Sequence, residues 1–180
     1  MNNIMYMGTT GRHNELVTFL IGKVLHLIEK KEIYAWHENC PLVYYAPEKL
    51  SNGLNLVDIK DIKNMDHFIE NVITELDHIK PDFMMFKDNP YVHNKKQTRT
   101  AGQPDLIVEI WSESNTDNDR AFIQKLYASS PVTEHWYIEQ DSNKVECYLG
   151  KGELPTQYLT DILVTQKGIE FDLRYLAIEN

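Results

Sequence analysis

The chain has 180 residues, and its 18 basic and 27 acidic side chains give a net charge of −9 with neutral histidines. Hydrophobic residues make up 42% and charged residues 25%, which excludes a disordered or fibrous chain and indicates an ordinary globular protein. The length allows a sizeable core, so we expect a single domain over residues 1–180. The negative charge disfavours non-specific binding to nucleic acid, but it leaves open an enzyme that meets DNA through a local basic patch and a metal ion.

No apolar run reaches the roughly 18 residues that a membrane span needs. The first residues lack a basic segment followed by an apolar one, so we expect no signal peptide. Cys40 and Cys147 are the two cysteines, and they form no disulfide framework. We therefore expect reduced thiols in a cytoplasmic protein.

In chain order, the first predicted element is a helix over residues 15–30, where apolar side chains recur at helical spacing. Glu15 is expected in its first turn, where the helix dipole favours a carboxylate. Leu42 to Tyr45 are predicted to form a short strand. Residues 66–79 follow a helical pattern, although β-branched residues inside it leave an extended conformation open.

Two apolar strands occupy the middle of the chain, one from Phe83 to Phe86 and one over residues 105–111. The first is apolar on both faces and the second is mostly apolar, which is typical of strands buried in a sheet. The segment between them, residues 88–102, is predicted to be a polar loop.

A helix is predicted from Asp117, whose side chain offers cap chemistry, to about Ser129. Its apolar face would be formed by Phe122, Ile123, Leu126 and Tyr127. Residues 134–140 and 144–149 are predicted to form a β-hairpin, and the tail to carry a short strand and a closing helical turn. The expected fold class is therefore α/β, with a mixed central β-sheet flanked by helices.

Two acidic residues interrupt the apolar strands, Asp82 at the start of the first and Glu109 inside the second. Burying the Glu109 carboxylate among isoleucine and valine side chains costs free energy unless it is paired or bound to a metal. A salt bridge to a buried lysine or arginine is one explanation, and a metal site is the other. If the two strands pair antiparallel around a loop centred near Lys95 or Lys96, the numbers of facing residues sum to about 191, and Asp82 faces Glu109.

Facing residues in a sheet have Cβ atoms roughly 4.5–5.5 Å apart, so Asp82 and Glu109 can share one hard cation. Asp105 is the competing acid on the face of Glu109, but at a strand rise of about 3.3 Å per residue it lies roughly 13 Å away. Two oxygen ligands without a nearby histidine or cysteine favour Mg²⁺ or Mn²⁺ over zinc.

The segments KPDFMMF, PDLIVEIWSES and DNDRAFIQKLYASSPVTEHWYIEQDSNKVECY together resemble the Uma-type restriction endonuclease family, which belongs to the PD-(D/E)XK nuclease superfamily. The shared features are a Pro-Asp that opens one strand, a Glu-x-x-Ser at the end of another, a helix with spaced Asp, Lys and Tyr, and a His-Trp strand. In this sequence they are Pro81, Asp82, Glu109, Ser112, Asp119, Lys125, Tyr127, His135 and Trp136. The entry to the first helix at His13 and the GIEFDL tail are also similar to the family.

The resemblance implies a metal-dependent phosphodiester hydrolase, in which Asp82 and Glu109 are catalytic and hold Mg²⁺ or Mn²⁺ with the backbone carbonyl of Ile110. The catalytic lysine of the superfamily lies two residues after the glutamate, where this chain has Trp111. Uma-type relatives share this departure, and the matching lysine on the following helix is Lys125. It would orient the attacking water and stabilise developing negative charge. The alternative for Lys125 is a solvated surface lysine.

Further candidate accessory residues match family positions: His13, Glu15, Asp119 and Tyr127. Each has a structural alternative, namely capping or hydrogen bonding for His13, dipole compensation for Glu15, support of a helix start for Asp119 and core packing for Tyr127. A basic loop with Lys95, Lys96 and Arg99 would grip a nucleic-acid backbone, or would be a solvated hairpin tip.

The sequence therefore predicts a Mg²⁺-dependent endonuclease that acts on DNA. A homodimer would provide the two sites that cutting both strands needs. The rival interpretation is a catalytically inactive module of the same fold that binds nucleic acid or a partner protein. The acidic net charge, the sparse basic residues and Trp111 in the usual lysine position support this rival.

Overall fold

The computed structural model describes residues 11–37, 42–45, 55–56, 78–88, 90–93, 99–129, 132, 134–142, 144–149, 157–159, 162–172 and 174. Its centre is a six-stranded sheet, with the strands in the order β1, β5, β8, β9, β10 and β11. These strands are β1 (Tyr34–His37), β5 (Phe83–Phe86), β8 (Leu106–Trp111), β9 (Glu134–Glu139), β10 (Val145–Leu149) and β11 (Gln157–Leu159). All neighbours pair antiparallel except β8 and β9, which are parallel. The sheet is mixed, which confirms the expected α/β fold class. The antiparallel pairing of β9 and β10 confirms the predicted hairpin.

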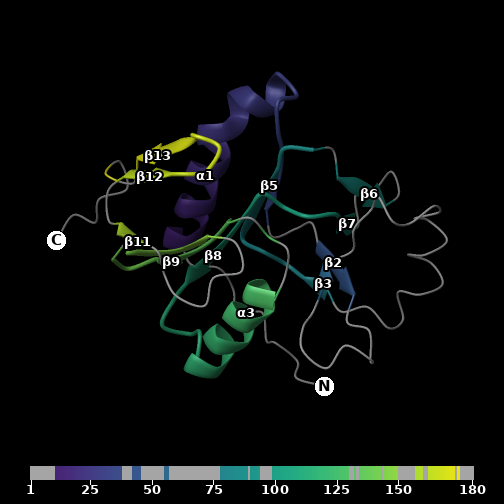
Figure 1. Ribbon diagram of the computed structural model, residues 1–180. Coiled ribbons are helices and arrows are strands. Elements are labelled where there is room, and N and C mark those ends of the chain that lie inside the picture. The colour runs from purple at the N-terminus through teal and green to yellow at the C-terminus, as the bar shows by residue number, and fades with distance from the viewer. Residues whose placement is uncertain are drawn as a thin grey trace.

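The helices α1 (Gly11–Glu29) and α3 (Asp117–Ser129) lie on opposite faces of this sheet (Figure 1). Because side chains alternate along a strand, Val108 and Ile110 of β8 pack in one core with α1, whereas Ile107 and Trp111 pack in a second core with α3. Helix α3 forms the crossover that the parallel pair β8–β9 requires. Within the described ranges, no helix has the length and apolar character needed to cross a membrane.

The strands β12 (Ile162–Val164) and β13 (Glu170–Asp172) form an antiparallel hairpin beside α1 (Figure 1). Leu163 and Phe171 are fully buried and complete the core on the α1 side of the central sheet. The strand predicted for the tail is therefore present, and residues 175–180, where the helical turn was expected, lie outside the described part of the chain.

A second, smaller sheet stands to one side of the first (Figure 1). It contains β2 (Leu42–Tyr45), β3 (Asn55–Leu56), β4 (His78–Ile79), β6 (Tyr91–His93) and β7 (Arg99–Ala101), in the order β3, β2, β7, β6 with β4 paired to β2. The prediction of β2 is confirmed. The prediction of a loop over residues 88–102 is wrong, because β6 and β7 pair there as a hairpin. His78 and Ile79 are also a strand rather than a helix end, and residues 57–77 lie outside the described residues.

The first helix begins earlier than the apolar pattern indicates. Its first residue is Gly11, so Glu15 is not in the first turn, which contains no acidic residue. Glu15 instead forms an exposed ion pair with Arg12, at 3.2 Å between carboxylate and guanidinium. The expected compensation of the helix dipole by Glu15 is therefore wrong.

The helix α3 begins at Asp117 as predicted, but its cap is the preceding Thr116. The Thr116 hydroxyl accepts a hydrogen bond from the Asp119 N–H at 3.2 Å, and Asp119 Oδ2 accepts the Thr116 N–H at 3.0 Å. This reciprocal pair is a capping box, and the Thr116 hydrogen bonds lower the pKa of the Asp119 carboxyl. Leu126 and Tyr127 are buried as expected, whereas Phe122 is 49% exposed, contrary to the prediction.

Candidate metal-binding active site

The strands β5 and β8 pair in the register that the sequence predicts. Phe83 faces Val108, so the numbers of facing residues sum to 191. The position before Phe83 is Asp82 and the position after Val108 is Glu109, so the two acids lie next to each other at this end of the strand pair. The Ile110 N–H donates a hydrogen bond to Asp82 Oδ2 at 2.6 Å. This bond attaches Asp82 directly to the strand that carries Glu109.

Glu109 lies on the face of β8 that α3 covers. The Tyr127 hydroxyl of α3 donates a hydrogen bond to Glu109 Oε1. Burial raises the pKa of Glu109 well above its ordinary value, and the nearby charge of Asp82 raises it further, while the Tyr127 hydrogen bond lowers it in part. Among the described residues, neither Asp82 nor Glu109 forms an ion pair with a lysine or arginine. The salt-bridge explanation for this half-buried glutamate is therefore not supported here.

His13 approaches the same acids from the other face of the sheet. It belongs to the first turn of α1 and is 8% exposed. Its Nε2 lies 3.0 Å from Asp82 Oδ1. The structure thus brings together four of the candidate residues, namely His13, Asp82, Glu109 and Tyr127, which come from α1, the start of β5, β8 and α3.

The remaining candidates lie elsewhere. Lys125 is exposed on α3 and makes no hydrogen bond or ion pair within the described residues. Residues two positions apart on a helix are separated by about 200° around its axis. The Lys125 side chain therefore leaves α3 on a different side from Tyr127. Asp119 belongs to the capping box of α3, and Glu15 forms an ion pair with Arg12. Lys95 and Lys96 lie outside the described residues, and Arg99 begins β7.

Trp111 occupies the usual lysine position, and its surroundings contain an arginine that sequence reasoning missed. The Arg120 guanidinium lies over the Trp111 ring, 4.7 Å from its centre. The same guanidinium pairs with the Glu139 carboxylate and donates to the carbonyls of Ser112 at 3.2 Å and Asn115 at 3.3 Å. Arg120 therefore ties α3 and the preceding loop to the ends of β8 and β9.

A second buried tyrosine lies close to Glu109. Tyr137 is the β9 residue that faces Glu109 across the parallel pair. Its hydroxyl lies 3.1 Å from His135 Nδ1, and its ring contacts Trp111 at 4.5 Å between centres. Burial and the nearby Glu109 carboxylate raise the pKa of Tyr137 well above its usual range, so the phenol stays protonated. Tyr137 thus belongs to the packing behind the acids, and its hydroxyl serves His135.

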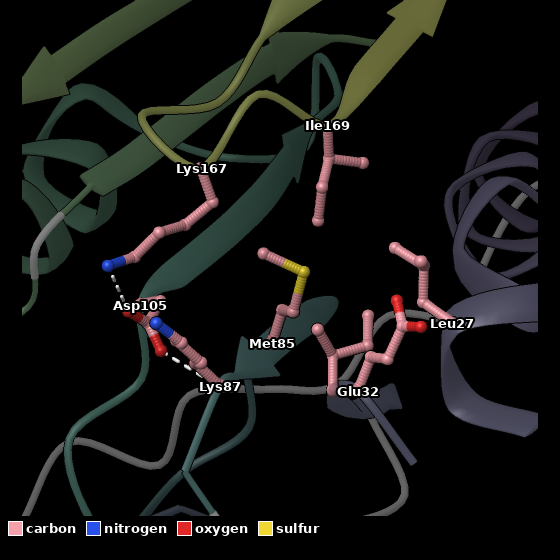
Figure 2. A pocket seen from close by; sticks show the side chains of 8 residues that line it. Leu27, Glu32, Met85, Lys87, Asp105, Lys167 and Ile169 are labelled. Atoms are coloured by element: carbon pink, nitrogen blue, oxygen red, sulfur yellow. Dashed lines mark hydrogen bonds and ion pairs between the residues drawn. The ribbon is translucent and has the colours of Figure 1, made fainter. Parts of the chain in front are cut away.

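The competing acid, Asp105, has a different setting at the other end of the strand pair (Figure 2). It lines a pocket with Met85, Lys87 and Lys167 among its walls. Asp105 Oδ2 accepts the Lys87 N–H at 2.7 Å, and Oδ1 lies 3.6 Å from Lys167 Nζ. These partners compensate the charge of Asp105. Asp82 and Glu109, in contrast, have no lysine or arginine partner among the described residues.

The donor set at Asp82 and Glu109 fits a hard divalent cation. Burial raises the pKa of Glu109, and repulsion by the neighbouring Asp82 carboxylate raises it further. A cation between the two carboxylates would remove that repulsion. No group of three or more His, Cys, Asp or Glu side chains suited to a metal exists within the described residues, so a closed site of zinc type is not present there. Mg²⁺ commonly uses one or two carboxylates and keeps several waters. These residues therefore suit Mg²⁺ or Mn²⁺.

The sequence also matches a known protein family. The sequence profile of Uma2, described as "Putative restriction endonuclease", matches residues 67–178, which is more than half of the chain. The chain belongs to the Uma2 family. The resemblance drawn from the strand and helix motifs is thereby confirmed. No curated protein matches the sequence.

The Uma2 chain also shares its fold with a solved structure, described as a putative nuclease belonging to DUF820 from Anabaena variabilis. The TM-score is 0.57 at 12% sequence identity, and the match covers 91% of this chain and 77% of the other. At this identity the comparison establishes the fold alone. It agrees with the nuclease-like α/β architecture of the central sheet and its two helices.

Proposed function

We propose that this protein is a Mg²⁺-dependent nuclease that hydrolyses phosphodiester bonds in DNA. The observation that carries the proposal is the adjacent pair Asp82 and Glu109, which has no lysine or arginine partner among the described residues. Membership of the Uma2 family and the fold shared with a nuclease-like structure support it. A homodimer that presents two such sites, one for each DNA strand, is part of the same proposal.

In this proposal, Asp82, Glu109 and the backbone carbonyl of Ile110 would hold Mg²⁺ or Mn²⁺. The bound ion would polarise the scissile phosphate and lower the pKa of a water ligand. The protein's own residues fix the two carboxylates through the Ile110 N–H and the Tyr127 hydroxyl. The basic residues Lys95, Lys96 and Arg99 would contact the DNA backbone.

The direct test measures Mn²⁺ binding by calorimetry and nicking of supercoiled plasmid with Mg²⁺, Mn²⁺ or EDTA. We expect binding of Mn²⁺ and cleavage that depends on the metal and stops in EDTA. The same protein with Ca²⁺, which prefers more ligands at longer distances, is expected to bind without efficient cleavage. Absence of both Mn²⁺ binding and cleavage of DNA and RNA would contradict the proposal.

Lys125 stays our candidate for the lysine that stabilises developing negative charge, and its exposed position makes a sharp test. If it reaches the phosphate when DNA is bound, Lys125→Ala should lower the cleavage rate about 100-fold or more, with unchanged Mn²⁺ affinity. Lys144→Ala is the matched control, because Lys144 is an exposed lysine that follows the β9–β10 turn. Equal rates for both variants would show that another group supplies the positive charge.

One observation favours a second function, that of a nuclease-fold module that binds nucleic acid or a partner protein without cleavage. The usual lysine position holds Trp111, which is buried under Arg120, and the guanidinium of Arg120 is already paired with Glu139. Stable binding of a DNA or RNA fragment, with no cleavage in Mg²⁺ or Mn²⁺, would support this function over the first.

A further inference from the structure

Each of the two acids is contacted by a side chain from a helix, and the two helices lie on opposite faces of the sheet. The Tyr127 hydroxyl of α3 donates to Glu109 Oε1. His13 Nε2 of α1 contacts Asp82 Oδ1 at 3.0 Å, while Asp82 Oδ2 is occupied by the Ile110 N–H at 2.6 Å. Both donors are buried, since Tyr127 is 0% and His13 8% exposed. Their placement is therefore fixed by the core and not by solvent.

We propose that Tyr127 and His13 are positioning residues that hold the Glu109 and Asp82 carboxylates in the orientation that a divalent ion requires. The proposal rests on the proposed function. It adds two residues that touch neither the metal nor the substrate, and it assigns each to one carboxylate oxygen.

The physical reason is the mutual repulsion of two neighbouring carboxylates. Without a donor, each would rotate away from the other toward water, and the cost of turning both back would weaken metal binding. A hydrogen bond to one lone pair of a ligating carboxylate fixes its rotation and leaves its remaining lone pairs for the ion. Tyr127 donates to Glu109 Oε1, and no described residue donates to Glu109 Oε2, whereas Asp82 is contacted at both oxygens. The arrangement therefore presets both ligands before the ion arrives.

Core packing is the alternative role for Tyr127, and the structure offers a matched control for it. Tyr137 packs in the same core cluster and is equally buried, with 1% exposure. Its hydroxyl lies 3.1 Å from His135 Nδ1 and makes no hydrogen bond to either acid. Tyr127→Phe and Tyr137→Phe each remove one buried hydroxyl, but only the first removes a donor from Glu109.

The experiment measures Mn²⁺ dissociation constants by calorimetry for the wild type and both variants, with melting temperatures of the metal-free proteins recorded alongside. Tyr127→Phe is expected to weaken Mn²⁺ binding about 10- to 100-fold, and Tyr137→Phe by less than about threefold. For His13, glutamine keeps an N–H donor near the position of Nε2 and leucine does not. His13→Leu should therefore weaken Mn²⁺ binding in the same range, and His13→Gln should restore most of the affinity.

Equal Mn²⁺ affinities for Tyr127→Phe and Tyr137→Phe, in a wild type that binds Mn²⁺ and cleaves DNA, would overturn this inference and leave the proposed function intact. A wild type that binds no Mn²⁺ would overturn both. If Tyr127→Phe does not fold, the hydroxyl proton of Tyr127 in the wild type provides the answer by NMR. Its resonance should persist when Mg²⁺ is added, and its disappearance on Mg²⁺ addition would contradict the retained hydrogen bond.

Discussion

Asp82→Asn is expected to lower the rate of metal-dependent cleavage at least about 1,000-fold, which corresponds to about 4 kcal/mol of transition-state stabilisation. Asparagine keeps the shape of the side chain, and its amide oxygen can still accept the hydrogen bond from the Ile110 N–H. The fold should therefore survive. The lost property is one of the two adjacent negative charges that would hold the ion, so Mn²⁺ binding should fall together with cleavage in plasmid-nicking and calorimetric assays.

Asp105→Asn is the control for this experiment. Asp105 lies at the opposite end of the same strand pair, and its carboxylate is paired with Lys167 and with the Lys87 N–H (Figure 2). The control should cleave at the wild-type rate. Wild-type cleavage by Asp82→Asn, or an equal loss in both variants, would show that Asp82 is not a metal ligand.

Glu109→Gln is expected to remove cleavage and, at the same time, to raise the melting temperature of the metal-free protein at neutral pH. Burial and Asp82 raise the pKa of Glu109 in the folded protein well above its ordinary value of 4.5. Between these two values the folded state holds a proton that the unfolded state has released. The free energy of unfolding therefore falls as pH rises from about 4.5 through the raised pKa. Glutamine carries no charge and avoids this loss.

The stability difference between Glu109→Gln and the wild type should be absent at acid pH and should grow as pH rises to neutrality. Each 1 kcal/mol corresponds to about 2–4 °C for a chain of this size. Thermal melts in EDTA between about pH 4 and pH 8 measure it. Glu113→Gln, at an exposed position in the loop after β8, should leave the melting temperature unchanged at every pH. A variant at Glu109 that melts lower than the wild type at neutral pH would contradict the prediction.

The sequence was sufficient to predict the strand pair that carries the acids. Phe83 to Phe86 and the residues around Glu109 are apolar on both faces, so the strands could be recognised. The assumption that the two strands pair antiparallel about a midpoint near Lys95 or Lys96 predicted the register in which Phe83 faces Val108. The hairpin β6–β7 could not be recognised, because three-residue strands are too short to show an alternating pattern.

The individual contacts of the acids could not be predicted from the sequence for a different reason, although the family positions had made His13 and Tyr127 candidates. His13 precedes the apolar repeat of α1, and its partner Asp82 is a residue far along the chain. Arg120 shows no periodic signal, since a polar residue near a helix start is usually solvated. Its role depends on Trp111 and Glu139, which the fold brings to it from two strands. The one signal in the sequence was that Trp111 occupies the position where the superfamily has its catalytic lysine.

The guanidinium of Arg120 links the crossover helix α3 to the ends of the two strands β8 and β9 at once. The helix that it braces also carries Tyr127, which reaches Glu109. Heating that loosens this brace would release the helix and disturb the acids in the same event. We therefore expect this protein to lose its cleavage activity on heating as soon as the contacts that hold α3 in place are lost.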